Sequence, residues 1–259
     1  MKDKTRLLHM LCLWHGMSRR AASTPRKPVS IYLYLCTPVC LNCKLTPVQV
    51  SYMNAWAKTI TDHTNSNAPL QTGWSGASWA RAAEIIRHTY KGWAANDIAA
   101  FEKMLKNVYL PKLLVGSQNN GNWELVMMEA ALGISVFLED KSSYDTAMQK
   151  ALSRIPAYVY LTSDGPYPKA ADGSGLTTKE QIIQFWQGQS TFPENGISQE
   201  TCRDFVHTGY GIASMYVVRK LIIVSDTTPL FLARILQRQA GYKGLICTRP
   251  MWGLACAMR

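Results

Sequence analysis

Apolar residues recur at helical spacing through the central part of the chain, from about residue 46 to residue 215. Side chains three and four positions apart share one face of an α-helix, so this spacing predicts helices with a buried face. Short polar turns containing Gly or Pro separate the periodic stretches. The alternation of apolar and polar positions that indicates strands has no clear place in this region. The pattern therefore predicts an all-α body built from paired helices.

Caps and prolines set the boundaries that we expect for these helices. Pro47 suits a first helical turn, where its missing N–H costs nothing, and Asp97 is a favourable N-cap. Pro111 is expected to stop the helix that follows Asp97. Thr178 and Gln181 match a capping box, which predicts a helix start. The expected helices cover residues 47–60, 76–90, 97–110, 124–138, 142–155 and 178–186.

The stretch from Gly196 to Ser214 combines helical spacing with chemically active side chains. Ser198 is a favourable N-cap, and Gln199 and Glu200 suit the first turn of a helix that begins there. This helix would have an apolar stripe formed by Cys202, Phe205, Val206, Gly209, Ile212 and Ala213. Its other face would carry Arg203, His207, Tyr210 and Ser214.

A polar row opposite an apolar stripe is what most surface helices show, so solvent exposure is the general interpretation. A solvated face normally carries Lys and Glu, whereas this one carries Arg203, His207 and Tyr210. These side chains can neutralise a carboxylate and move protons. The functional interpretation stays open and needs support from other parts of the chain.

The net charge of +11 belongs to the two ends of the chain. Residues 1–50 hold eight Lys or Arg and one acidic residue, residues 216–259 hold seven and one, and the body between them carries −2. A nucleic-acid interface would rest on the ends alone and has no recognisable motif. We therefore expect no nucleic-acid partner.

Six of the seven cysteines also lie in the ends, and three of them are closely spaced. Cys36, Cys40 and Cys43 have the spacing of the iron-sulfur motif in enzymes that cleave S-adenosylmethionine. That fold needs strands alternating with helices, whereas helices follow here. A zinc site would lack a fourth nearby ligand. We expect neither a metal nor a cofactor.

Residues 7–14 form a short apolar run after a basic start, as in a signal peptide. The run contains a histidine and lacks a convincing small-residue cleavage site. No stretch of the chain is long enough to span a membrane, so we expect no membrane partner.

Three segments together resemble the alginate lyase family of polysaccharide lyases, and its fungal and actinobacterial branch most of all. They are Asn119-Asn120-Gly121-Asn122-Trp123-Glu124, Trp186-Gln187-Gly188-Gln189 and the stretch from Gln199 to Gly211. The resemblance implies an incomplete α/α toroid of helical hairpins around a sugar-binding cleft. It also implies a secreted or periplasmic enzyme that cleaves an acidic polysaccharide, alginate or a glucuronic-acid polymer, by β-elimination.

The reaction requires three groups. The proton on C5 of a uronic acid becomes acidic only when donors neutralise the neighbouring carboxylate, because abstraction adds negative charge to it. A base then removes the proton, and an acid protonates the departing glycosidic oxygen. No metal is needed in principle.

The resemblance assigns these roles to particular residues. Asn119 lies at the position of the family's neutralising asparagine, and Asn120 takes the place of its catalytic histidine. Arg203 and Tyr210 keep the seven-residue separation of the family's arginine and its tyrosine acid. Asparagine cannot act as a base, so we expect His207, or Tyr210 as a phenolate near Arg203, to take the proton. Tyr210 is the expected acid.

The remaining motif residues are candidates for substrate contacts. Asparagines before a buried helix are usually turn and cap residues, although they can also point amides at an anion. Tryptophans stack on sugar rings, although buried packing is their commoner role. The substrate-binding candidates are Asn122, Trp123, Trp186, Gln187 and Gln189.

Both flanks depart from the family pattern, because they are basic, aperiodic and bear cysteines. We expect a partial lyase-like domain at residues 46–215, between irregular tails at residues 1–45 and 216–259. The tails are interpreted as translated intron or a shifted frame, which would truncate the toroid. The alternative function is a catalytically inactive toroid that binds carbohydrate.

Overall fold

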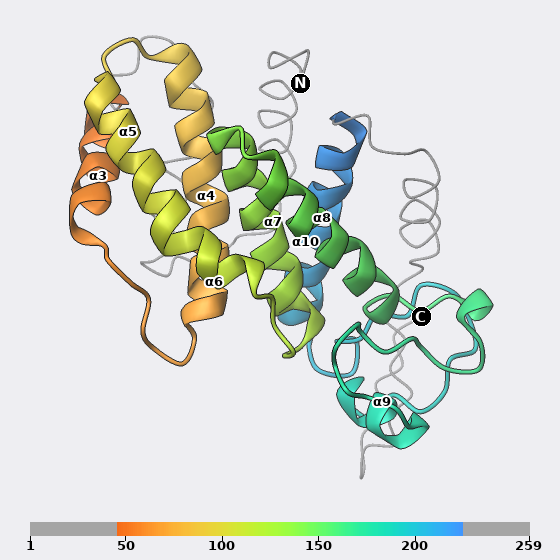
Figure 1. The fold of residues 1–259 in the computed structure, drawn as a ribbon. Coiled ribbons are helices and arrows are strands. Elements are labelled where there is room, and N and C mark those ends of the chain that lie inside the picture. The colour runs from red at the N-terminus through yellow and green to blue at the C-terminus, as the bar shows by residue number, and fades with distance from the viewer. Residues whose placement is uncertain (1–45, 225–259) are drawn as a thin grey trace. The chain divides into compact units, whose positions relative to one another are not determined.

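The computed structural model describes residues 46–224, with side chains up to Leu221, and this part of the chain is helical (Figure 1). A π-helical segment at Leu105–Tyr109 joins α5 to α6, and 3₁₀ turns lie at Ile155–Ala157 and Thr162–Asp164. The helices are α3 (Thr46–Thr59), α4 (Ala68–Thr89), α5 (Ala95–Met104), α6 (Leu110–Leu114), α7 (Gly121–Leu138), α8 (Lys141–Arg154), α9 (Lys179–Phe185) and α10 (Phe205–Val224). The described residues form no strand, which confirms the all-α prediction.

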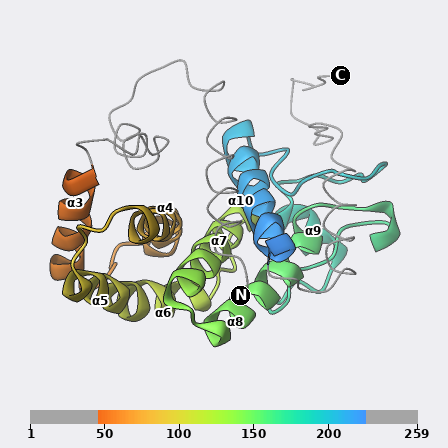
Figure 2. The same ribbon diagram turned by 90° about the horizontal axis from the view of Figure 1, so that it is seen from above.

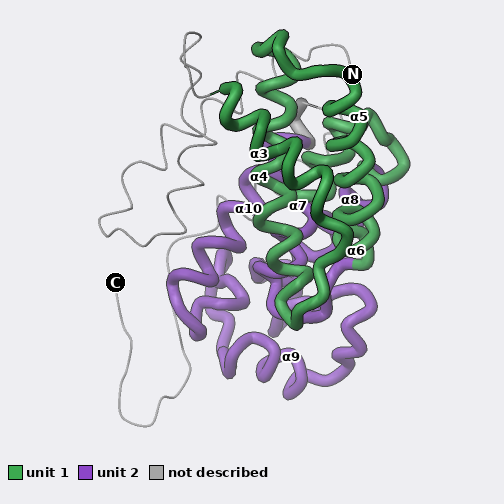
Figure 3. Tube along the Cα trace, turned by 90° about the vertical axis from the view of Figure 1, so that its left-hand side faces the viewer, with its two compact units in different colours: residues 1–115, 130–144 green, residues 116–129, 145–259 purple. Residues whose placement is uncertain are grey.

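The described residues fall into two compact units (Figure 3). Residues 46–115 and 130–144 belong to the first unit, and residues 116–129 and 145–224 belong to the second. The candidate chemistry lies in the second unit.

An aromatic cluster forms the core of the first unit. Phe101 is fully buried, and its ring lies edge-on to Trp79, Trp93 and Phe137 at centroid distances of 5.9, 5.7 and 6.2 Å. Helix α3 packs against α4 and α5, which lie beside it in both views (Figure 1, Figure 2). The predicted helical periodicity therefore produces the expected buried faces in this unit.

Helix α4 begins at Ala68, eight residues before its predicted start, with Pro69 in its first turn. A Cβ on Gly76 would lie 3.1 Å from the Tyr109 ring and 3.3 Å from the Ala130 methyl group. The missing side chain at Gly76 thus allows close helix packing. Contacts between helices outweigh the low intrinsic helix propensity of glycine here.

Two predicted boundary signals in this unit were wrong. Asp97 lies inside the first turn of α5, whose N-cap is Ala94, and its Oδ2 accepts a 2.8 Å hydrogen bond from Asn54 Nδ2. Pro111 does not stop the helical path, because it lies in the first turn of α6, directly after the π-helical segment. A proline lacks only an N–H that such a turn leaves unpaired.

The second unit contains long non-helical segments around a smaller apolar cluster. Tyr160, Ile182, Trp186 and Ile197 are buried together in this cluster. The capping box of Thr178 and Gln181 opens α9 as predicted, with Gln181 N–H donating to Thr178 Oγ1 at 3.2 Å.

Helix α10 begins at Phe205, so the prediction of a helix from Ser198 was wrong. Ser198 forms an isolated antiparallel bridge with Val159, and residues 199–203 form turns, with Gln199 N–H donating to Tyr158 O at 2.8 Å. The buried side of α10 carries Thr208, Gly211, Ser214, Met215 and Val218. Phe205 and Val206, which were expected to be buried, are 56% and 64% exposed.

The predicted boundary at residue 215 falls inside α10, which continues to Val224. Val218 is fully buried, so the helix keeps an apolar side beyond that boundary. The predicted tail at residues 1–45, with its three closely spaced cysteines, and the part after residue 224 lie outside the described residues.

Candidate functional site

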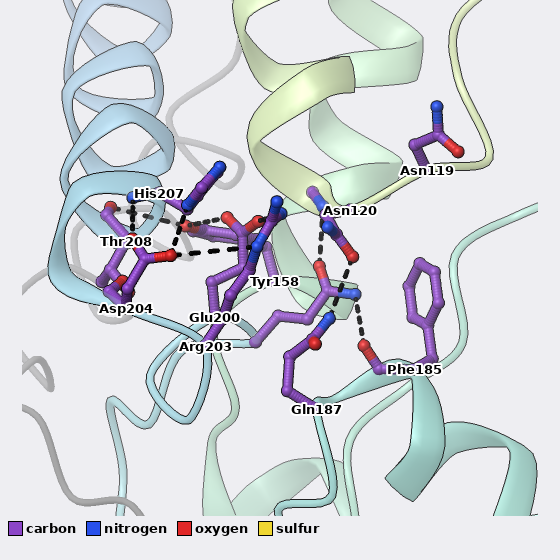
Figure 4. Close-up of polar contacts among 12 residues, drawn as sticks. Asn119, Asn120, Tyr158, Phe185, Gln187, Glu200, Arg203, Asp204, His207 and Thr208 are labelled. Atoms are coloured by element: carbon purple, nitrogen blue, oxygen red, sulfur yellow. Dashed lines mark hydrogen bonds and ion pairs between the residues drawn. The ribbon is translucent and has the colours of Figure 1, made fainter.

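A carboxylate and an imidazole form a close pair at the start of α10 (Figure 4). Asp204 is the residue before the helix, and its Oδ1 accepts a 2.8 Å bond from His207 N–H, as an N-cap does. Its Oδ2 lies 2.6 Å from His207 Nδ1. The carboxylate therefore favours the tautomer with a proton on Nδ1, which leaves Nε2 with a lone pair. The His207 side chain is one-third exposed, so solvent can reach it.

Hydrogen bonds from His207 keep Asp204 ionised. Burial by itself would raise the pKa of the Asp204 carboxyl, but the backbone N–H and the ring of His207 outweigh it, and the pKa is lowered. An ionised Asp204 both orients the imidazole and stabilises its protonated form.

A buried carboxylate holds Arg203 beside this pair. Glu200 is fully buried, and its Oε1 accepts a 3.1 Å bond from Arg203 Nη1. Its Oε2 accepts a 3.0 Å bond from Tyr158 Oη. Burial raises the pKa of the Glu200 carboxyl, while the Tyr158 hydroxyl and the Arg203 charge act in the opposite direction. Arg203 Nε also lies 4.0 Å from Asp204 Oδ2, so one guanidinium joins the two carboxylates.

The stretch before Arg203 is buried although it is not helical. Its backbone and side chains must therefore find partners elsewhere in the unit. Gln199 Oε1 accepts a 2.8 Å bond from Gly121 N–H, and Gln199 Nε2 donates to Phe185 O at 3.1 Å. The hydroxyls of Ser198 and Thr201 are 2.9 Å apart. Gln199 thus joins the start of α7 to the end of α9, and this bonding explains why a helix does not begin at Ser198.

The Asn119–Asn120 turn lies before α7. Asn120 Oδ1 accepts a 3.1 Å bond from Gln187 Nε2, so the structure brings these two predicted residues together. The Asn119 side chain is exposed and stands apart from the others in Figure 4. Its backbone is engaged, since its carbonyl accepts a 2.7 Å bond from Arg154 Nη2 and its N–H donates to Ser117 Oγ at 3.1 Å. Gln187 has a φ of +59°, a strained value for a residue with a side chain.

A buried ion pair supports this turn. Arg154 is fully buried, and its Nη1 lies 3.3 Å from Glu124 Oε2 in the first turn of α7. Burial raises the pKa of Glu124 and lowers that of Arg154, while their mutual attraction opposes both shifts. Removing either partner would leave an uncompensated buried charge.

Several predicted substrate contacts lie in the interior. Trp186 is 1% exposed and packs edge-on against Phe192 at a centroid distance of 5.4 Å. Gln189 is 1% exposed, and its Nε2 donates to Thr191 O at 2.7 Å. Asn122 is 2% exposed. The side chains of Trp186, Gln189 and Asn122 therefore pack inside the protein. A ligand at the surface would not touch them.

The other predicted residues keep some exposure. Trp123 and Gln187 are partly buried, and Tyr210 is 47% exposed. Tyr210 lies three residues after His207 in α10, so both side chains occupy neighbouring positions on one helix.

Sequence reasoning did not single out Asp204, Tyr158 and Arg154 as site residues. Asp204 had a visible signal, because a helix start at Phe205 would make it the N-cap. Tyr158 and Arg154 contact residues 30 or more positions away, and no local pattern indicates such contacts.

Within residues 46–224, no group of three or more His, Cys, Asp or Glu side chains is arranged to hold a metal ion. No helix in this part of the chain has the length and apolarity to cross a membrane. Comparisons with protein-family models, with curated proteins and with solved structures give no match to this chain.

Proposed function

We propose that this protein is a polysaccharide lyase that cleaves an acidic, uronate-containing polymer by β-elimination. The observation that carries the proposal is the 2.6 Å contact between Asp204 Oδ2 and His207 Nδ1, beside the guanidinium of Arg203. A carboxylate-oriented imidazole next to a cation is suited to remove a proton α to a carboxylate. The toroid architecture and a secreted or periplasmic location belong to the same proposal.

His207 acts as the base in this proposal. Its Nε2 takes the C5 proton, and Asp204 stabilises the imidazolium that forms. This role replaces the histidine that the family resemblance places at Asn120. Tyr210 donates its phenolic proton to the departing glycosidic oxygen.

Arg203 and Asn120 neutralise the substrate carboxylate. Because Asn120 Oδ1 accepts the bond from Gln187, Nδ2 of Asn120 can donate an N–H to a substrate carboxylate oxygen. The guanidinium of Arg203 adds a positive charge. Its attraction to the substrate carboxylate strengthens as negative charge develops there. Asn119 contributes through its backbone, since its side chain stands apart.

The test is ultraviolet absorbance of the C4–C5 unsaturated uronate after mixing the protein with alginate, glucuronan or a neutral glycan. A rise with one acidic polymer, lost in Arg203→Ala and Tyr210→Phe, supports elimination. The loss of the catalytic histidine at Asn120 favours the second candidate, an inactive carbohydrate-binding protein. Binding of an acidic oligosaccharide in calorimetry without any absorbance change would establish that candidate and overturn the proposed reaction.

A further inference from the structure

Tyr158 is fully buried and lies against three segments that carry candidate residues, namely residues 199–203 and the starts of α7 and α10. Its hydroxyl donates to Glu200 Oε2 at 3.0 Å and lies 3.4 Å from the carbonyl oxygen of Thr208 in α10. Figure 4 shows Tyr158 and Glu200 between the His207 pair and Asn120.

Two glycines give the Tyr158 ring its space. A methyl group on Gly121 would overlap with ring carbons Cδ2 and Cε2, and one on Gly211 would overlap with the hydroxyl and Cζ. Neither glycine has a positive φ, so each is required for space and not for backbone conformation. Gly121 directly follows Asn120, and Gly211 directly follows Tyr210. The ring therefore lies between the backbone that carries the amide donor and the backbone that carries the acid.

We propose that Tyr158 is a positioning residue that sets the separation between Asn120 and Tyr210. Its ring keeps the starts of α7 and α10 apart, and its hydroxyl holds Glu200, which in turn holds Arg203. This inference rests on the proposed function. Elimination requires donors at the carboxylate on C5 and an acid at the glycosidic oxygen on C4, which are neighbouring carbons of one sugar. A misplacement of about 1 Å costs an enzyme roughly 100-fold in rate.

The first comparison uses two glycines of α10. Gly211→Ala is expected to lower kcat on the order of 100-fold with a smaller change in KM, because the added methyl group displaces the Tyr158 hydroxyl. Gly209→Ala is the matched control, since nothing lies within 4 Å of an added Cβ there. The control is expected to keep both constants. Near-ultraviolet circular dichroism shows whether each variant is folded.

The second comparison uses Tyr158→Leu, which keeps side-chain carbons out to the δ position and removes the outer ring carbons and the hydroxyl. The methyl group of Gly211→Ala would overlap with the hydroxyl, Cζ and Cε1, all of which leucine lacks, so the double variant is expected to recover part of the lost kcat. The methyl group of Gly121→Ala lies closest to Cδ2 and also overlaps with Gln199 Oε1, so Tyr158→Leu, which keeps carbons at the δ position, is not expected to rescue it. A residue that merely stabilises the fold would not produce this selective rescue.

Equal losses in Gly209→Ala and Gly211→Ala, or an unchanged kcat in Gly211→Ala, would overturn the positioning role. If the folded wild-type protein cleaves no acidic polymer, the proposed function fails, and crystal structures of the same variants decide the positioning role alone. The expected result is a shift of Tyr210 relative to Asn120 in Gly211→Ala that is reduced by adding Tyr158→Leu. An unshifted Tyr210 in folded Gly211→Ala would contradict the inference.

Discussion

Glu84 in the first unit and Glu200 in the second are both buried, and their carboxylates find their partners in different ways. Glu84 in the first unit lies 2.8 Å from Arg87 Nη2 and 3.1 Å from His88 Nε2, and all three residues belong to α4. Glu200 in the second unit accepts its shortest bond from Tyr158, 42 residues earlier in the chain. Helical spacing brings the first set together, whereas only the tertiary fold brings Tyr158 to Glu200.

Other buried polar groups show the same difference. In the first unit, the hydroxyls of Thr72, Ser78 and Ser135 each donate to the carbonyl four residues earlier in their own helix. In the second unit, Gln199 joins segments 78 and 14 residues away. These three hydroxyls of the first unit therefore depend on single helices, whereas Gln199 of the second unit depends on segments that also carry the candidate site.

The largest expected effect is a loss of activity, and it should differ between His207 and His88, which both contact a carboxylate. His207→Ala should lower lyase activity about 1,000-fold, because it removes the proposed base. His88→Ala is the control, since His88 also contacts a carboxylate but lies in the first unit. Initial rates on the acidic polymer that the wild type cleaves provide the measurement. Equal activity in the two variants would show that His207 is not the base.

The next effect compares a long-range amide with a local hydroxyl. Gln199→Ala leaves the buried Gly121 N–H and Phe185 carbonyl without their partner, and should lower the free energy of unfolding by about 3 kcal/mol. Thr72→Ala should cost about 1 kcal/mol or less, because it removes a single bond within α4. Urea denaturation measures both values. A larger loss in Thr72→Ala would reverse the comparison.

A smaller effect concerns pH. Because the pKa of Glu200 is raised in the folded state, the folded protein binds more protons than the unfolded chain between the ordinary glutamate pKa and the raised value. The contribution of Glu200 to stability is therefore present at low pH and is lost as pH rises through the raised pKa. Each unit of the shift is worth about 1.4 kcal/mol.

Glu200→Gln should remove this loss, so its unfolding free energy should fall less than that of the wild type as pH rises from about 4 to about 8. Asp204 has a lowered pKa and contributes in the opposite sense, since its stabilisation is lost as pH falls. Parallel pH profiles of the wild type and Glu200→Gln would show that Glu200 does not titrate as stated.

The smallest effect tests a local signal inside the second unit. Thr178→Ala removes the cap of α9 and should cost about 1 kcal/mol in unfolding free energy. Lyase activity should stay unchanged, because neither Thr178 nor Gln181 contacts a candidate residue through a hydrogen bond in the described part of the chain. A large loss of activity would mean that α9 also positions Gln187.

Sequence reasoning predicted the parts that depend on neighbours along the chain. The all-α character, the buried faces of α3 and α7 and the capping box of α9 follow from spacings of three and four residues. Arg203, His207 and Tyr210 stood out by residue type. Their roles stay predictions, although the structure gives His207 a carboxylate partner.

Only the tertiary structure decided where α10 begins and which polar groups hold its first turn. Ser198 and Asp204 are both favourable N-caps, and the sequence by itself does not rank them. The choice of Asp204 follows from Gln199 and Glu200, whose bonds to Gly121 and Tyr158 hold residues 198–203 outside the helix. These partners lie 78 and 42 residues away along the chain. A buried segment can stay non-helical only when the fold supplies hydrogen-bond partners for its polar groups, and the local sequence does not show such distant partners.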